Sequence, residues 1–193
     1  MRRRARDALA LLLLSCAAVA CATPKGSTKV QASMDVMERE QTPDKLFERG
    51  KGFASIGDVT RAEQYLTAAL ERGGDSAKIT PVLLQVYIDG RRFRNAVEHC
   101  EHALEKDPQN LRLRFLLGTL YNAVGDAPSA ITALGRVVEL DPNHAEAHYA
   151  LAVLQREAHN ADAADRHFRE YLRISPKGPH AAEARGSLLT PIP

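Results

Sequence analysis

The sequence predicts an all-α protein made of repeated helix hairpins, and three observations support this. The stretch 111–142 contains two apolar stripes at helical spacing. Gly125 and Asp126 separate the stripes, and these residues can end one helix in the left-handed conformation and cap the next. The same pattern recurs without a gap at a period of 34 residues over 43–178. Because one hairpin cannot bury both of its stripes, the hairpins must stack.

The period divides the chain into four blocks, 43–76, 77–110, 111–144 and 145–178. The middle of each second helix carries an alanine, namely Ala62, Ala96, Ala130 and Ala164. Four residues later come Leu66, Cys100, Leu134 and Phe168. The first helices share a small residue in three blocks, at Gly50, Gly118 and Ala152, with Leu84 in its place in the second block. A proline closes the last three blocks, at Pro108, Pro142 and Pro176.

This register resembles the tetratricopeptide repeat in its period, its small-residue positions and its closing proline. The resemblance implies a right-handed superhelix of four helix hairpins. A further helix over 179–189, within a C-terminal segment 179–193, is expected to cap the last apolar edge. Pro81 lies where the other first helices are already under way, so we expect that helix to begin late, with Thr80 as its cap.

The resemblance also implies a binding surface, because the first helices of such arrays line a concave groove. The residues expected to form it are Phe47, Lys51, Lys78, Gln85, Arg112, Phe115, Thr119, Asn122, Tyr149, Val153 and Arg156. Aromatic and cationic side chains provide much of the energy at protein interfaces, so this mixture fits a peptide or helix with apolar anchors and some acidic character. Stacking between adjacent first helices explains each of the three aromatic residues equally well.

Residues 1–20 have the pattern of a secretory signal peptide, with four arginines before the apolar run 8–14 and small residues after it. The run is too short for a permanent membrane helix. The residues before Cys21 resemble the lipobox of a bacterial lipoprotein, which implies that Cys21 carries a lipid. A rival lipobox ends at Cys16, and plain secretion or an uncleaved anchor is a further alternative. Residues 21–42 are small and polar, and we expect a flexible tether there.

Charge and motifs exclude several classes of function. Without residues 1–20 the chain has 22 basic and 23 acidic residues and no basic stripe, which argues against nucleic acid as a ligand. No nucleophile elbow, phosphate-binding loop, HExxH or CxxC is present, so we expect neither an enzyme nor a cofactor. The candidate metal ligands are interpreted as surface histidines and a packing cysteine, and no metal site is expected; they are His99, Cys100, His102, His144 and His148.

These features predict a lipid-anchored adaptor in the bacterial cell envelope whose groove holds another envelope protein. Ala22 after Cys21 resembles lipoproteins sorted to the outer membrane, so we expect the periplasmic face of that membrane. The layout is similar to the pilotin-like repeat lipoproteins of type IV pilus assembly, which implies a role in a pilus, motility or secretion complex. The alternatives are a scaffold for outer-membrane protein assembly or cell-wall enzymes, and a structural protein whose repeat edges self-associate.

Overall fold

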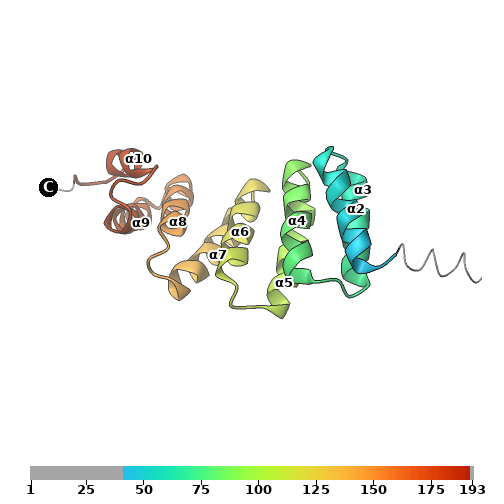
Figure 1. Cartoon of the computed structure of the whole chain (residues 1–193). Coiled ribbons are helices and arrows are strands. Elements are labelled where there is room, and N and C mark those ends of the chain that lie inside the picture. The colour runs from blue at the N-terminus through green and yellow to red at the C-terminus, as the bar shows by residue number, and fades with distance from the viewer. Residues whose placement is uncertain (1–40, 192–193) are drawn as a thin grey trace, which may run out of the picture. The chain divides into compact units, whose positions relative to one another are not determined.

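The computed structural model describes residues 41–191, so the predicted signal peptide and both candidate lipid-bearing cysteines lie outside the described residues. The described part is all-α, as predicted, and forms four helix hairpins and a capping helix that follow one another in chain order (Figure 1). The hairpins are α2 (Pro43–Ser55) with α3 (Val59–Glu71), α4 (Ser76–Asp89) with α5 (Phe93–Lys106), α6 (Leu111–Ala123) with α7 (Ala127–Leu140), and α8 (Ala145–Glu157) with α9 (Ala161–Ile174). The capping helix is α10 (Ala181–Gly186).

Short polar residues start most of these helices. The side chain of the residue before the helix accepts a backbone N–H bond in α3, α4, α6, α7, α8 and α9, through Asp58, Asp75, Asn110, Asp126, His144 and Asn160. The turn inside each hairpin contains one residue in the left-handed region. These residues are Gly57, Arg91, Gly125 and His159, with φ of 76°, 53°, 85° and 58°. The predicted roles of Gly125 and Asp126 are therefore confirmed.

A small residue on one helix faces a large residue on the other within the hairpins. A Cβ on Gly50 would lie 2.7 Å from Cγ of Leu66, and a Cβ on Gly118 would lie 2.6 Å from Cγ of Leu134. These glycines are needed because the two helices approach too closely for any side chain at that position. The second hairpin reverses the pattern, with Leu84 on α4 and Cys100 on α5, both buried.

Within residues 41–191, three clusters of buried apolar residues form the core, and each joins helices that are consecutive in the chain. The first cluster runs from α2 to α6, the second joins α7 to α8, and the third joins α8, α9 and α10 around Phe168 and Tyr171. In α10 the inward side chains are Ala181 and Ala184. Between residues 41 and 191, none of the helices has the length and apolar character needed to cross a membrane.

The expectation that the helix at Pro81 begins late is wrong. Helix α4 begins at Ser76, and the Asp75 carboxylate accepts the N–H of Ala77 at 3.0 Å. Starting early also places Ile79 in the core, where it is 2% exposed. The cost of Pro81 is reduced, though not removed, because the carbonyl that loses its partner belongs to the exposed Ala77 and can be hydrated. Capping and burial therefore outweigh one lost hydrogen bond.

Candidate functional site

The groove residues predicted on α2 and α4 interact mainly with their own helices. Nζ of Lys51 lies 3.0 Å from Glu48 and 5.2 Å from the ring centre of Phe47, which is half-buried. On α4, Gln85 donates to Asp89 at 2.7 Å, and exposed Lys78 lies 3.4 Å from Asp75. These are exposed pairs between near neighbours, so each is worth little and a ligand can displace it.

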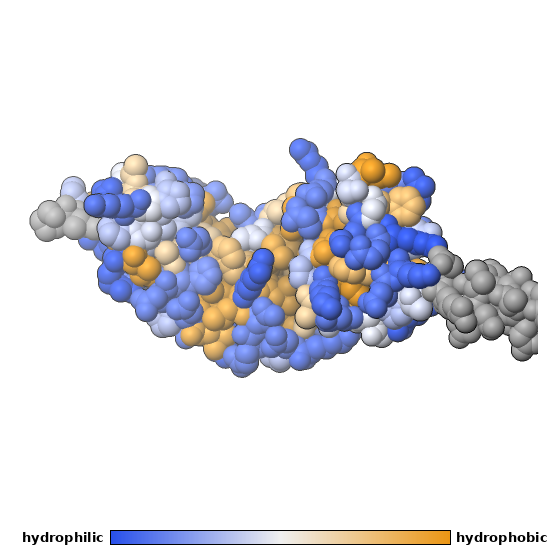
Figure 2. All heavy atoms as spheres, in the orientation of Figure 1, coloured by the Kyte–Doolittle hydropathy of each residue, from blue (hydrophilic) through white to orange (hydrophobic). Residues whose placement is uncertain are grey.

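Among the predicted groove residues, those on α6 make the fewest polar contacts with other residues of the described chain. Arg112 is exposed, and in the described part of the chain its side chain makes no hydrogen bond or ion pair. Phe115 is half-buried, with its ring centre 4.8 Å from that of His144, and it packs against the core cluster of α7 and α8. Thr119 donates to its own helix, to the Leu116 carbonyl at 2.7 Å, and Asn122 is exposed. Figure 2 shows apolar surface around α6, bordered by hydrophilic side chains.

The groove residues on α8 hold the capping helix. The Tyr149 ring stacks on His180 with 3.8 Å between ring centres, and its hydroxyl donates to Glu183 at 2.6 Å. Arg156 donates to Glu183 at 3.1 Å and to Ser187 at 2.9 Å. Tyr149 therefore stacks within the array, against the start of the capping helix α10, which is the alternative that the sequence left open. Val153 is half-buried in the same core cluster.

These contacts shift the acidity of both partners. Burial and the bond to Glu183 raise the pKa of Tyr149 to about 12. The bonds from Tyr149 and Arg156 hold the pKa of the Glu183 carboxyl below its ordinary value. At neutral pH the tyrosine is protonated and the glutamate is charged, which is the arrangement that makes the donor–acceptor pair strongest.

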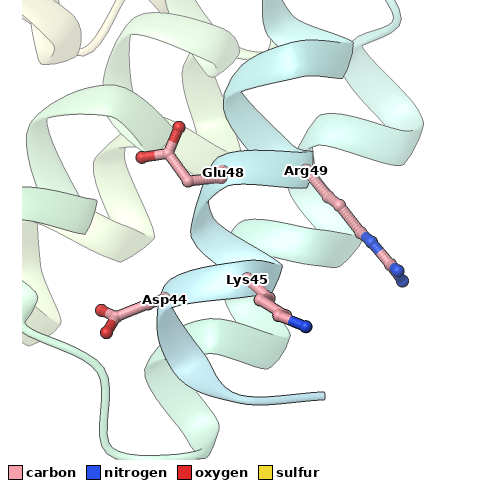
Figure 3. Close-up of a pocket in the computed structure, with 4 residues that line it drawn as sticks. All are labelled: Asp44, Lys45, Glu48 and Arg49. Carbon is pink, nitrogen blue, oxygen red and sulfur yellow. The ribbon is translucent and has the colours of Figure 1, made fainter. Parts of the chain in front are cut away.

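The structure also contains an open pocket on α2, away from the apolar surface of α6. It is lined by Asp44, Lys45, Glu48 and Arg49, which are exposed. Figure 3 shows the two carboxylates projecting to one side of the helix and the two cations to the other. Side chains that diverge from a single helix do not converge on a bound molecule, so this pocket lacks the geometry of a small-molecule site.

The histidines and Cys100 were the other candidates, and one interpretation of them is wrong. His148 is a buried residue, 7% exposed, whereas the sequence indicated a surface histidine. Its Nδ1 lies 3.1 Å from Nδ1 of His167, a residue that the sequence analysis did not single out. His144 caps α8 instead of pairing with His148. Cys100 is fully buried, as expected, and burial raises the pKa of its thiol to about 12, so it is an inert packing residue.

No three or more His, Cys, Asp or Glu side chains converge as metal ligands within residues 41–191. The spacing of histidines along a single helix does not predict the pairing of His148 with His167, because the two residues lie on different helices. The repeat register does contain a signal for this pair. His148 is the fourth residue of its block, on the first helix, and His167 is the twenty-third, on the antiparallel second helix, where the two positions are neighbours.

Comparison with known proteins gives a consistent picture. A family model described as tetratricopeptide repeat matches residues 47–110 and 115–179, and a second one of that description matches 87–137. Sperm-associated antigen 1 of Mus musculus is 28% identical over 144 residues, which is 72% of this chain but 15% of the mouse protein. The Rattus norvegicus protein is 28% identical over 142 residues, 71% of this chain and 16% of the rat protein. The chain thus spans only a small part of these relatives.

Solved structures show the same fold at low identity. YrrB, described as a TPR protein with an unusual peptide-binding site, has a TM-score of 0.65 at 19% identity, covering 82% of this chain and 88% of YrrB. MamA has a TM-score of 0.63 at 19% identity, covering 77% of this chain and 87% of MamA. A repeat protein from Parabacteroides merdae has a TM-score of 0.68 at 21% identity, covering 76% of this chain and 59% of its own.

Proposed function

Because the chain belongs to the tetratricopeptide repeat family, we propose that it is a lipid-anchored adaptor that holds a partner protein in the groove lined by its first helices. The family is one of protein–protein interaction scaffolds and is generally non-catalytic. An adaptor of this kind works through effective concentration: the anchor keeps the groove at a membrane, and the groove keeps the partner there.

The main support for the groove proposal is the surface of α6, which combines an unpaired cation with partly exposed apolar side chains. Arg112 is exposed without a partner in the described chain, and Phe115 and Leu116 beside it are half-buried. An apolar side chain of a ligand would cover Phe115 and Leu116, and an acidic group would pair with Arg112. The peptide-binding site in the description of YrrB supports peptide as the class of ligand.

The anchor is proposed on the sequence alone. Cys21 follows a segment with the charge and apolar run of a signal peptide, and 21 residues separate it from the start of α2. A location at the periplasmic face of the outer membrane follows from Ala22, by the resemblance to sorted lipoproteins. Assistance to a pilus, motility or secretion complex is the narrower form of this proposal and rests on the layout of anchor, linker and repeats.

A photo-crosslinking amino acid at Phe115 tests the groove in the living cell. We expect one dominant partner, identified by mass spectrometry, whose capture falls at least tenfold when Arg112→Glu is added. The matched control places the same amino acid at Thr132, which is exposed on the second helix of that hairpin. Equal capture from both positions, or capture insensitive to Arg112→Glu, would refute the groove as the working surface.

Metabolic labelling with a fatty acid tests the anchor independently of the groove. We expect Cys21→Ser to remove the label and release the chain from the membrane fraction, while Cys16→Ser leaves both unchanged. The opposite pattern would move the lipid to Cys16, and an unlabelled wild-type chain would contradict lipidation. Either result leaves the groove experiment to stand on its own.

A further inference from the structure

We propose that His148 and His167 form a binding site for a late first-row divalent metal ion, such as Cu²⁺, Ni²⁺ or Zn²⁺. The two residues come from the antiparallel helices α8 and α9, and their Nδ1 atoms lie 3.1 Å apart. Neither residue belongs to the groove. Imidazole nitrogen is a ligand that these three ions favour, and two such nitrogens facing one another provide half of a four-coordinate shell.

The surroundings of His148 leave its Nδ1 free to bind a metal. Its Nε2 lies 3.1 Å from the carbonyl oxygen of Pro142, which can only accept a hydrogen bond. The proton of neutral His148 is therefore on Nε2, and the lone pair is on Nδ1, facing His167. A backbone carbonyl that accepts from the distal ring nitrogen is a common support of metal-binding histidines, because it fixes both tautomer and ring orientation.

The separation of the two nitrogens fits two ligands of one ion. At a metal–nitrogen distance of about 2.05 Å, neighbouring ligands lie about 2.9 Å apart at a right angle and about 3.4 Å apart at the tetrahedral angle. The observed 3.1 Å lies between these values. Without a metal the same separation admits one N–H···N bond, donated by His167 Nδ1 to His148 Nδ1. Metal binding would displace the proton from this bond.

Nearby charges and solvent access determine how an ion can reach the pair. Of the charges on α9, Glu170 attracts a cation at this point and Arg166 repels it. His167 is half-buried, so the remaining coordination positions can be reached by water from its exposed side.

The other histidines differ, and this makes them suitable controls. His102 is exposed and lies 3.2 Å from Glu105, while His99 is half-buried with a buried Nε2 that has no partner in the described chain. His144 accepts the Ala147 N–H as the cap of α8. None of these three brings its ring nitrogen to a second imidazole nitrogen within residues 41–191.

Calorimetric titration of the full chain with Cu²⁺ tests the site. We expect one ion per chain, and we expect His167→Gln or His148→Gln to weaken its binding at least about tenfold. The control variant His99→Gln/His102→Gln should bind as the wild type does. Binding that survives His167→Gln, or that is lost only in the control variant, overturns the proposal. Circular dichroism of each variant separates loss of a ligand from loss of the fold.

Electron paramagnetic resonance of the wild-type chain with one equivalent of Cu²⁺ needs no substitution. We expect splitting from two imidazole nitrogens, reduced to one in His167→Gln. A wild-type spectrum without nitrogen splitting, or with splitting unchanged by His167→Gln, means that the pair is a hydrogen bond alone and refutes the metal site. This outcome remains decisive even if substitution of the buried His148 unfolds the last hairpin.

Discussion

In the second hairpin the large residue lies on the first helix and the smaller residue on the second helix, which is the reverse of the first and third hairpins. Gly50 and Gly118 on first helices accommodate Leu66 and Leu134 on second helices, whereas α4 carries Leu84 and α5 carries Cys100. Leu84 is 4% exposed and Cys100 is not exposed at all. The exchange keeps one large and one smaller side chain at the two register positions, and cores tolerate such compensated changes better than single ones.

The exchange predicts a strong coupling between these two positions. Cys100→Leu alone should cost about 1–3 kcal/mol by overpacking, and Leu84→Ala alone about 2–5 kcal/mol by leaving a cavity. The double variant restores the pattern of the other hairpins, so its cost should be smaller than the sum by at least about 1 kcal/mol. Urea unfolding of the four chains measures this difference. As a control, Leu84→Ala combined with Val137→Ala in α7 should be additive; additivity in the test pair would contradict the exchange.

We predict that His99 makes the folded chain less stable in mild acid. Burial, followed by the charges of His102 and Lys106, lowers the pKa of His99 in the folded chain. The unfolded chain therefore binds a proton more readily. Stability from this residue is complete above its ordinary pKa of about 6.5 and decreases as the pH falls below that value. We expect His99→Leu to reduce the difference between urea midpoints at pH 7.5 and 5.5. An identical difference in both chains would show that His99 has no such role.

Helix α4 shows how capping and core packing can override a local sequence rule. In α4 the proline rule predicted a start after Thr80, but Asp75 and the burial of Ile79 start the helix five residues before Pro81. Helix α4 thus contains an interior proline, Pro81, which removes one backbone hydrogen bond from the helix. The N–H that an alanine would supply at that position has an acceptor available, the carbonyl of Ala77.

Pro81→Ala should therefore stabilise the chain. The substitution restores one helical hydrogen bond and removes the ring clash, against a loss of about 0.4–1 kcal/mol from the freer unfolded chain, for a net gain of about 1–2 kcal/mol. Thermal unfolding measures the gain, and hydrogen exchange should slow in the first turns of α4. Pro128→Ala is the matched control, because Pro128 lies in the first turn of α7, where no hydrogen bond is missing. A destabilised Pro81→Ala chain would contradict this account.

The sequence predicted these elements well because its signals are local and repeated. Gly125, Asp126 and the inward position of Cys100 could all be read from spacing within one hairpin. The side-chain contacts between elements could not be derived in the same way. Tyr149 donates a hydrogen bond to Glu183 in the capping helix α10, and His148 faces His167 across its own hairpin. Hydrophobic periodicity gives the side of a helix that is buried but not the residue that a polar side chain meets.

At the scale of the whole molecule, the buried core of residues 41–191 is divided into separate clusters. Phe168 lies in the cluster of α8 to α10, and Leu66 lies in the cluster of α2 to α6. Both side chains are fully buried. In such an array the stability is a sum of terms for each hairpin and for its contacts with neighbours, so damage at one end need not unfold the other.

Hydrogen exchange of two matched variants tests this division. Phe168→Ala should cost about 3–5 kcal/mol and speed exchange mainly in α8, α9 and α10. Leu66→Ala, with a cost of about 2–5 kcal/mol, should speed exchange mainly in α2, α3 and α4. Uniform acceleration over all helices in either variant would mean that residues 41–191 unfold as one cooperative unit.

The chain-order packing described above also has a consequence for how the polypeptide is made. Each buried cluster joins consecutive helices, and even the Tyr149–Glu183 bond spans only 34 positions. Low contact order of this kind favours fast folding from local nuclei. A polypeptide that leaves the ribosome N-terminus first can thus complete α2 and α3 before α8 and α9 have emerged. Folding would then follow synthesis hairpin by hairpin, and little aggregation-prone surface would remain exposed while a distant segment is made.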